Sequence, residues 1–569
     1  MMKLKTVIGQ CAVETGHLNL NFNQMKEMIE QAENAQADLI VFPELVLSGT
    51  CVGDKWEAKE FIDDLCAYNQ KLAELSSELM IVWGNVLKEE DKLYNAVYCA
   101  VDGQVVYTQT KRILKSTNTS CEHRFFSVKE DASTVEYKGA QLGFVMGDEI
   151  HHTDLIPLCD VLIHIESKAW TLDDEGLYDA VMKQLNHPCV VHVNAAGMQN
   201  TGKNVLMFDG GSALYQMTEA THRLTDGFVS ECAVIEECFD HRIEHKLMTC
   251  LVHSIREFDR QTLPYKPKWI IGLSGGLDSS VTAALLSMAV GADRIVGYNL
   301  ATRYNSENTK DNASNLANAL GIELRNGYIS EVVEASVRTA EIYGYKEENM
   351  ATLVLENIQA RVRGHLLSTF AQIENGVIMN NGNKIEVALG YATMYGDSIG
   401  AIGPIGDLTK VQLFDLSHEI NAYLGREVVP ERLLPVVNDE SLTWEMAPSA
   451  ELREAQYDPM KWFYHDWLID QLTGDVSAED IMEDYLSGKF MNSSMGRWLK
   501  YYHLDSGKNF IEDLEWVLRQ MRVSIFKRVQ SVPVVMVTKR AYGTNTQEVQ
   551  GIFDVSERYT KLKEAILRG

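Results

Sequence analysis

The sequence lacks the features of a membrane protein and of a disulfide-rich or cysteine-ligated protein. None of its ten cysteines forms a Cys-x-x-Cys pair, so zinc ribbons and dithiol redox centres have little support. The N-terminus has no long apolar signal region, and no segment is long enough to span a bilayer. From these absences we expect a cytoplasmic protein without a membrane partner, whose cysteines are mostly small buried hydrophobic side chains.

Positive charge is scarce as well. The 52 Lys and Arg residues stand against 80 Asp and Glu residues, which gives a formal net charge of −28. This balance argues against nonspecific binding of nucleic acid, so we expect no nucleic-acid partner. In so acidic a chain, a site for an anionic nucleotide must gather its lysines and arginines locally.

The length of 569 residues is too great for one hydrophobic core, and it predicts two large domains. Short β-rich runs alternate with helical stretches along the first half, which predicts α/β layering. The expected strands are 6–9, 39–42, 80–83, 142–145, 161–164 and 190–193, with a helix at 23–37, an amphipathic helix at 241–259 and a late strand at 532–537. We expect a first domain at 1–235, a linker and entry helix at 236–262, and a second domain at 263–569.

The most informative stretch is 269–280, which reads Trp-Ile-Ile-Gly-Leu-Ser-Gly-Gly-Leu-Asp-Ser-Ser. A short apolar run predicts a buried strand, which breaks at a Ser-Gly-Gly turn before a helix-forming run. This order brings backbone N–H groups and the positive end of a helix into one small space, which suits phosphate. The hydroxyls of Ser274, Ser279 and Ser280 add donors, and Asp278 could carry a magnesium ion. The P-loop pattern Gly-x-x-x-x-Gly-Lys-Ser/Thr has no match.

This loop resembles the SGGxDS loop of the N-type ATP pyrophosphatases, and further segments narrow the resemblance. They follow in order as LENIQARVR at 355–363, GNKIE at 382–386, GYATMYGD at 390–397, PIGDLTK at 404–410, PSAEL at 448–452, FKRVQ at 526–530 and RAYG at 540–543. The series is similar to that of NAD synthetases. Other N-type pyrophosphatases share the loop but not the GYxTxYGD and PSAEL segments. The second half is therefore identified as a member of that family.

The resemblance implies a Rossmann-like domain with a parallel sheet that amidates deamido-NAD to NAD at the expense of ATP. The poorly electrophilic nicotinate carboxylate is first adenylated with loss of pyrophosphate, and ammonia then attacks the mixed anhydride. The resemblance also implies that the protein forms a homo-oligomer. The implied catalytic residues are Asp278, Glu386, Asp397 and Lys410; the pyrophosphate site is Ser274, Gly275, Gly276, Leu277, Asp278, Ser279 and Ser280; Mg²⁺ is bound by Asp278 and Glu386; and deamido-NAD is contacted by Arg361, Lys384, Asp397 and Lys527.

Two departures from the family pattern fall in this half. Asn380 and Asn381 stand where relatives have Gly-Thr, and Asn312 stands where many relatives have Asp. Asparagine still donates and accepts hydrogen bonds, so these changes bear on individual contacts more than on activity.

The first half resembles the nitrilase-like glutaminase domain of glutamine-dependent NAD synthetases, which implies an α-β-β-α fold. FPELVLSG at 42–49 matches the segment that carries the Glu base, here Glu44. Asn95 and Gly103 precede Lys111 as matching residues precede the catalytic lysine in that family. Glu122 lies at the family's usual separation from this lysine. A later segment, FDGGS at 208–212, also matches.

The nucleophile segment is where the match fails. The family reads G-x-x-I-C-E-D, whereas 143–149 reads Gly-Phe-Val-Met-Gly-Asp-Glu, so Gly147 stands at the cysteine position. A glycine supplies no thiolate, and Glu44 and Lys111 serve proton transfer and oxyanion stabilisation rather than nucleophilic attack. Lys168 also follows Ser167 where relatives often have Pro. We expect a degenerate glutaminase site, with ammonia taken from solution or from a separate partner.

Two alternatives remain open. Another thiol, Cys121 or Cys51, could replace the missing nucleophile in a glutamine-dependent enzyme, although catalysis tolerates little misplacement of reacting atoms. The protein could instead be a nucleotide-binding regulatory pseudoenzyme. The complete phosphate loop, Glu386 and Asp397 argue against that reading, because the degeneration is confined to the first half.

Overall fold

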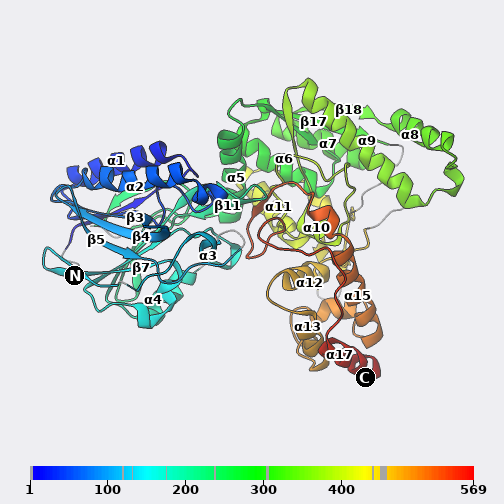
Figure 1. Ribbon diagram of the computed structural model, residues 1–569. Coiled ribbons are helices and arrows are strands. Elements are labelled where there is room, and N and C mark those ends of the chain that lie inside the picture. The colour runs from blue at the N-terminus through cyan, green and yellow to red at the C-terminus, as the bar shows by residue number, and fades with distance from the viewer. Residues whose placement is uncertain are drawn as a thin grey trace. The chain divides into compact units, whose positions relative to one another are not determined.

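The computed structural model describes residues 4–117, 121–130, 132–174, 176–235, 239–302, 307–438, 441–448 and 458–569, with the side chains of 307–310 left aside. Two compact units share the chain: Met1–Glu257 with Met536–Thr538, and Phe258–Val535 with Lys539–Gly569 (Figure 1). Most of the expected PSAEL loop, from Ser449, lies outside the described residues. Within the described ranges, no helix is both long and apolar enough to cross a membrane.

The first unit is built on two sheets. The six-stranded sheet runs in the order β14 (Glu231–Val234), β1 (Thr6–Gln10), β2 (Leu39–Val41), β3 (Met80–Glu89), β4 (Lys92–Val101) and β5 (Gln104–Thr110). The seven-stranded sheet runs in the order β15 (Phe239–Asp240), β13 (Glu219–Arg223), β12 (Ala213–Gln216), β9 (Cys189–Asn194), β8 (Val161–Glu166), β7 (Ala140–Met146) and β6 (Val135–Tyr137). In each sheet the central strands, β1–β2–β3 and β7–β8–β9, are parallel.

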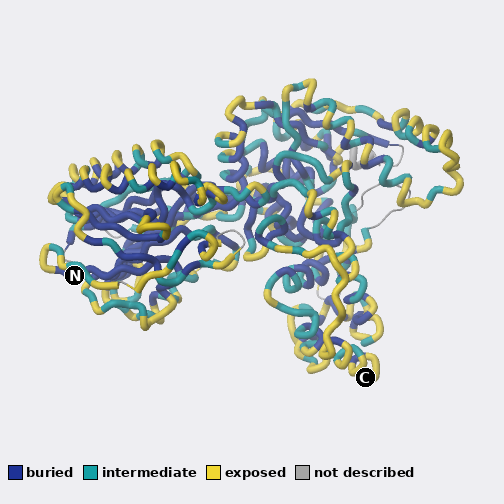
Figure 2. Tube along the Cα trace, viewed as in Figure 1, coloured by how far each residue is buried: buried dark blue, intermediate teal, exposed yellow. Residues whose placement is uncertain are grey.

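Apolar side chains from both sheets form one core between them, including Ile8 and Val82 from the first sheet and Phe144 and Ile163 from the second. Helices cover the outer faces. The helices of this unit are α1 (Leu18–Asn34), α2 (Lys59–Ala73), α3 (Glu122–Phe125) and α4 (Leu177–Leu185), and a hairpin joins β10 (Ala196–Asn200) to β11 (Asn204–Asp209). α1 and α2 pack on the first sheet, and the second carries α4. This is the expected α-β-β-α sandwich, and Figure 2 shows the strands buried beneath partly exposed helices.

The second unit has a four-stranded, all-parallel sheet in the order β18 (Glu323–Tyr328), β17 (Ile295–Ala301), β16 (Lys268–Gly272) and β19 (Gly376–Met379). Its helices are α5 (Lys246–Thr262, which begins in the first unit), α6 (Leu277–Val290), α7 (Glu307–Leu320), α8 (Ser330–Ile342), α9 (Thr352–Ile373), α10 (Lys384–Leu389) and α11 (Lys410–Leu424). On one face of the sheet, α9 packs against Ile270 and Val296. The expected Rossmann-like parallel-sheet domain is confirmed.

A helical layer completes the second unit. It consists of α12 (Tyr464–Thr473), α13 (Ala478–Leu486), α14 (Gly496–Tyr501), α15 (Gly507–Val523), α16 (Ile525–Arg528) and α17 (Glu557–Arg568), with the short strands β20 (Val436–Val437) and β21 (Leu442–Thr443). These helices share an aromatic core that also takes in Ile385 and Leu389 of α10. The helical layer is therefore anchored to the segment that carries several of the expected site residues.

Several boundaries differ from the sequence prediction, and three of them have a local cause. α1 occupies Leu18–Asn34 rather than 23–37, because Leu and Asn alternate in its first turn and mask the helical period there. α5 begins at Lys246 rather than at 241, since β15 precedes it and His245 has a φ of +56°, which interrupts a right-handed helix. The late strand is reduced to Val534–Met536, and Pro533, just before it, has no N–H to donate to a ladder.

Candidate functional site

The strand order of the second unit places two loops together. β16 lies between β17, which follows it in sequence, and β19, which comes about a hundred residues later, so the strand order reverses between β16 and β19. In open parallel sheets, ligands bind at the carboxyl ends of the strands at such a switch point. The two loops that leave these ends are joined directly, because the Asn381 side chain donates to the Gly272 carbonyl oxygen at 2.9 Å.

The phosphate loop after β16 has the conformation that its sequence predicts. Gly275 has a φ of +82°, which favours glycine, and Gly276 is the extended residue before the first turn of α6. The hydroxyl of Ser280 donates back to the Gly276 carbonyl at 2.8 Å. By helix geometry, the amides of Leu277, Asp278 and Ser279 have no carbonyl one turn earlier within the helix, so they present N–H groups at its positive end.

A charged cluster lies beside the loop. Lys410 Nζ is 2.6 Å from Asp278 Oδ2, and the Asn383 amide donates to Asp278 Oδ1 at 3.3 Å. Asn383 also caps α10 by accepting the backbone amides of Ile385 and Glu386. Burial raises the pKa of Glu386 to about 8, and the nearby charge of Asp278 adds to the shift. Two carboxyl groups, one lysine and a helix N-terminus therefore converge at the switch point.

The asparagines that depart from the family pattern hold these loops. Asn380 donates to the carbonyls of Asp397 and Ile399 at 2.8 and 2.9 Å, which fixes the loop that follows the GYxTxYGD segment. Asn312 donates to the Gly275 carbonyl at 3.1 Å and accepts from Arg432 Nε at 2.6 Å. Both residues fix the shape of the backbone around the loop, and an aspartate at 312 would offer no amide to the Gly275 carbonyl.

The ENxQAR-like helix α9 packs on the GYxTxYGD segment. Thr393 donates its hydroxyl to Asn357 Oδ1 at 2.7 Å, and a Cβ on Gly364 would lie 2.5 Å from the Gly396 carbonyl oxygen, so only glycine allows this close approach. Asp397 accepts the Thr393 amide at 2.5 Å and is exposed, as is Arg361 on α9. These two expected ligand residues are therefore accessible.

Two expected lysines are engaged within the protein. Lys384 is buried, with Nζ 3.2 Å from Asp407 and 2.9 Å from Asp470. Lys527 donates to the carbonyls of Gly390 and Ala392 at 2.6 and 2.8 Å, just beyond the C-terminus of α10. The ammonium groups of both lysines therefore hold the position of α10.

The first unit has a buried charged trio at the expected glutaminase site. Lys111 Nζ lies 2.5 Å from Glu44 and 2.9 Å from Glu122, and the Asn95 amide donates to Glu44 at 2.6 Å. Only 1% of Lys111 and 1% of Glu44 is exposed. Burial disfavours the Lys111 ammonium, but the two carboxylates outweigh it and raise its pKa. Gly84 allows this packing, since a Cβ there would lie 2.5 Å from the Glu44 Cα.

Gly147 faces this trio from the end of β7. A Cβ built on it would lie 3.0 Å from Lys111 Nζ and 3.6 Å from Glu44 Oε2, so a side chain at 147 would point directly at both groups. The residue has a φ of +52°, and its carbonyl lies 2.9 Å from His164 Nε2. Position 147, where the motif predicts the nucleophile, therefore lies beside Lys111 and Glu44.

The two thiols considered as replacements lie in different settings. Cys51 Sγ contacts the Thr50 hydroxyl at 3.6 Å, and burial raises the pKa of its thiol to about 11. A thiol of this kind is a poor nucleophile, because the thiolate is the reactive form. Cys121 is exposed and directly precedes α3, which carries Glu122.

Sequence models of two families match the chain. Residues 251–500 match NAD synthase, and residues 7–161 match carbon-nitrogen hydrolase. The two matches fall in the same order as the two domains of the glutamine-dependent NAD synthetases that this chain resembles. The glutamine-dependent NAD(+) synthetase of Xylella fastidiosa is 25% identical over 568 residues, spanning 95% of this chain and 97% of the relative. That of Thermotoga maritima is 24% identical over 518 residues, with 81% and 86% covered.

Solved structures share the fold of this chain. The glutamine-dependent NAD+ synthetase of Acinetobacter baumannii, determined with adenosine diphosphate, has a TM-score of 0.70 at 23% identity and covers 95% of this chain and 98% of its own. The enzyme of Cytophaga hutchinsonii has a TM-score of 0.75 at 15% identity, with 99% of each chain covered.

Sequence reasoning missed several supporting residues of the NAD synthase domain. Arg432 reaches Asn312 from a segment more than a hundred residues away, and Asp470 reaches Lys384 from α12. Neither partner lies in a recognisable motif, so only the fold brings them together. Asn383 does lie within the GNKIE segment, and its preference for the N-cap position could have indicated its role.

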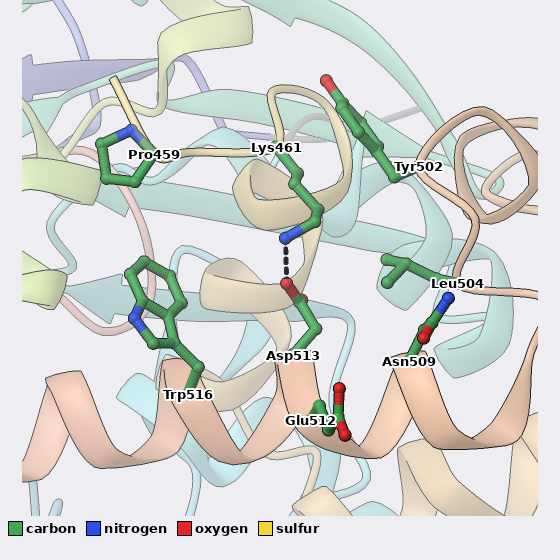
Figure 3. Close-up of a pocket in the computed structure, with 8 residues that line it drawn as sticks. All are labelled: Pro459, Lys461, Tyr502, Leu504, Asn509, Glu512, Asp513 and Trp516. Atoms are coloured by element: carbon green, nitrogen blue, oxygen red, sulfur yellow. Dashed lines mark hydrogen bonds and ion pairs between the residues drawn. The ribbon is translucent and has the colours of Figure 1, made fainter. Parts of the chain in front are cut away.

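The helical layer also contains a cavity of about 400 Å³ that no sequence motif indicated (Figure 3). Lys461 points at Asp513 across it, and the buried His465 Nε2 lies 3.0 Å from the other oxygen of Asp513. The cavity is lined by Pro459, Lys461, Tyr502, Leu504, Asn509, Glu512, Asp513 and Trp516.

Proposed function

We propose that this chain amidates deamido-NAD with free ammonia, using ATP, and that its first unit has no glutaminase activity. The ATP-dependent amidation follows the family; the use of ammonia is specific to this chain. The observation that carries it is Gly147, whose missing side chain would otherwise point at Lys111 and Glu44. Amide hydrolysis through a thioester needs a nucleophile there, and glycine supplies none.

For the synthetase step, the proposal assigns roles around the phosphate loop. The nicotinate carboxylate oxygen forms a bond to the α-phosphorus of ATP, the α–β P–O bond breaks, and pyrophosphate leaves. Backbone amides of Leu277 to Ser279 would hold the departing pyrophosphate, with the hydroxyl of Ser274 nearby. Lys410, already paired with Asp278, would offset the negative charge that develops. Ammonia then adds to the acyl carbon, loses a proton, and expels AMP.

The deamido-NAD site is proposed to use four residues in two ways: Asp397, Arg361, Lys384 and Lys527. The exposed Asp397 and Arg361 would contact the substrate. Lys384 and Lys527 would act as positioning residues, because their ammonium groups bind Asp407, Asp470 and the carbonyls after α10.

The carboxyl groups of Asp278 and Glu386 fit a magnesium ion. Oxygen ligands are those that Mg²⁺ prefers, and the charge of Asp278 is among the causes that raise the pKa of Glu386. Two carboxyl groups whose charges oppose each other are a donor set that a divalent cation neutralises. Bound there, the ion would lessen the repulsion between these carboxylates and the triphosphate.

The test supplies deamido-NAD, ATP and Mg²⁺ with either ammonium or glutamine, and measures NAD and glutamate. We expect NAD with ammonium alone, and no glutamate from glutamine. Glutamine-driven NAD with release of glutamate would contradict the ammonia assignment and direct attention to Cys121 or Cys51. Failure with both nitrogen donors, despite nucleotide binding, would favour a regulatory protein.

Two variants sharpen the test. Asp278→Asn should abolish the ammonium-driven reaction, whereas Cys121→Ala should leave it unchanged. Trace ammonium in the glutamine could also support NAD formation. Removing this ammonium from the glutamine stock abolishes such apparent activity, whereas a true glutaminase reaction is unaffected.

A further inference from the structure

Three side chains of metal-ligating type gather on the second sheet of the first unit. His164 and Glu166 lie two residues apart on β8, and His192 is the register partner of His164 on β9. They share a face with Leu162 and Val190, which pack towards α4, and all three are buried. One ligand atom from each lies within 4.8 Å of the others.

The contacts of His164 define its tautomer. Its Nε2 lies 2.9 Å from the Gly147 carbonyl, which can only accept, so Nε2 carries the proton and donates. Nδ1 of His164 therefore presents its lone pair to Nδ1 of His192, which lies 3.0 Å away. Metal-bound histidines commonly donate their second ring N–H to a carbonyl in this way, which fixes the ring for coordination.

A hydrogen bond between the two imidazoles leaves one feature of Glu166 unexplained. Its Oε1 accepts from Lys115 at 3.3 Å, but its Oε2 is buried and has no hydrogen-bond partner among the described residues. A buried carboxylate oxygen left without a hydrogen bond is costly, because it has lost its water and gained no donor. A proton shared between His164 and His192 satisfies the two rings and leaves this oxygen unsatisfied.

We propose that His164, Glu166 and His192 bind one divalent transition-metal ion of the zinc class. Two imidazole nitrogens and one carboxylate oxygen suit zinc better than the hard cations Mg²⁺ and Ca²⁺, which take oxygen ligands. Tetrahedral zinc with nitrogen ligands needs the two nitrogens roughly 3.3 Å apart, so the present 3.0 Å requires only a small opening.

The ion would tie the strand ends of the sheet together. It would join β8 to β9 through the two histidines, and it would reach the end of β7 through the hydrogen bond of His164 to Gly147. Lys115 remains paired with the other oxygen of Glu166. One carboxylate would thus bind both the metal ion and the Lys115 ammonium. The site is a stabilising one, independent of the activity proposed for the second unit.

The test uses the full chain after treatment with a chelator and removal of that chelator. Zinc binding is measured by calorimetry, and Co²⁺ is added as a spectroscopic probe. We expect one ion per chain and a higher unfolding temperature of the first unit. Glu166→Gln and His192→Gln should each weaken binding at least tenfold, whereas His222→Gln, which changes a buried histidine elsewhere on the same sheet, should not.

The ten cysteines make sulfur ligation the main competing outcome. X-ray absorption of the zinc-loaded wild-type protein separates the two, and it does not depend on whether a variant folds. Imidazole and oxygen scattering without sulfur supports the proposal. The proposal is overturned by sulfur ligation, by no stoichiometric zinc binding to the wild type, or by equal affinity in the Glu166→Gln, His192→Gln and His222→Gln proteins.

Discussion

Gly147 combines a φ of +52° with a Cα–H that points at a buried ion pair. A left-handed backbone is disfavoured for most residues with a side chain. The conformation at 147 therefore favours glycine, whatever chemistry the site performs. The trio opposite pairs Lys111 with both Glu44 and Glu122, and burial together with the charge of Glu44 raises the pKa of Glu122. At the residue scale, the backbone conformation and the neighbouring charges both restrict which side chain position 147 can carry.

Gly147→Ala should destabilise the first unit by more than about 1 kcal/mol, because the left-handed backbone alone costs a residue with a Cβ about that much. Its Cβ would also lie 3.0 Å from Lys111 Nζ and displace it. Gly16→Ala is the matched control, since Gly16 has a φ of +74° and open space around it. Urea unfolding compares the two variants. An equal loss in both would show that Lys111 accommodates the methyl group without cost.

Lys410→Met should reduce ammonium-dependent NAD formation at least about a hundredfold, the size typical of losing one preorganised charge. The substitution leaves Asp278 and Glu386 without their lysine partner. Lys489→Met, which removes an exposed lysine paired with Asp484, is the control. Steady-state rates test this, and a change in KM with no fall in kcat would contradict the role given to Lys410.

α10 shows how one short element positions a site. The helix begins at Lys384 because Asn383 accepts two first-turn amides, and it ends where Gly390 adopts a left-handed conformation. Lys527 and Arg528 then bind carbonyls at its C-terminus, where positive charge is favoured. These contacts orient Glu386 towards the phosphate loop, so we expect the activity to depend on the caps as well as on the carboxyl group.

Asn383→Ala should cost about 1 kcal/mol through the lost cap and should also lower kcat, because the side chain also donates to Asp278. Ser556→Ala removes the cap of α17 and provides a control of similar stability cost. The measurements are urea unfolding and ammonium-driven turnover. If both variants lose stability and turnover alike, Asn383 has no role beyond capping.

The helical layer predicts a pH dependence of stability. Burial lowers the pKa of His465 below its ordinary 6.5, and His465 with Lys461 lowers the pKa of Asp513 against the effect of burial. The neutral imidazole is thus favoured in the folded state. Its contribution is present above pH 6.5 and is lost as the pH falls below it. The contribution of Asp513 is likewise present above its ordinary pKa near 4 and is lost at lower pH.

Stability of the second unit should therefore fall between pH 6.5 and 5.5 by up to about 1.4 kcal/mol from His465 alone. His465→Gln should flatten this slope, while His503→Gln, at a more exposed histidine, should retain it. Denaturant unfolding at a series of pH values is the measurement. A slope unchanged in His465→Gln would assign the pH dependence to other groups.

Sequence predicted the elements of the fold better than the contacts of the site. The strands at 39–42, 161–164 and 190–193 were placed within two residues, because buried parallel strands are short continuous apolar runs. The motif at 382–386 predicted that Lys384 would be functional, but it could not predict the ion pair with Asp470. That partner comes from α12, over 80 residues later, and carries no local signal.

At the scale of the whole molecule, two units carry separate hydrophobic cores. Separate cores predict separate unfolding transitions, each responding to the ligands of its own unit. The charge of −28 adds a general repulsion towards anionic substrates, which the lysines and arginines of the second unit must overcome locally.

Calorimetric unfolding should thus show that ATP with Mg²⁺ raises the transition of the second unit. At a hundred times the dissociation constant, the stabilisation is about 2.7 kcal/mol. The transition of the first unit should stay in place, and glutamine should shift neither transition. A shift of the first transition by glutamine would indicate that its pocket still binds that amide.

The charged trio of Glu44, Lys111 and Glu122 also bears on how this chain can change over evolutionary time. Replacing Lys111 leaves two buried carboxylates without their cation, a defect that costs roughly 3 to 5 kcal/mol, close to the whole stability of many domains. Only simultaneous replacement avoids that loss, and simultaneous changes are rare. The trio is therefore expected to persist in descendants of this chain whether or not it does any chemistry, and its presence in a sequence is no proof of a working glutaminase.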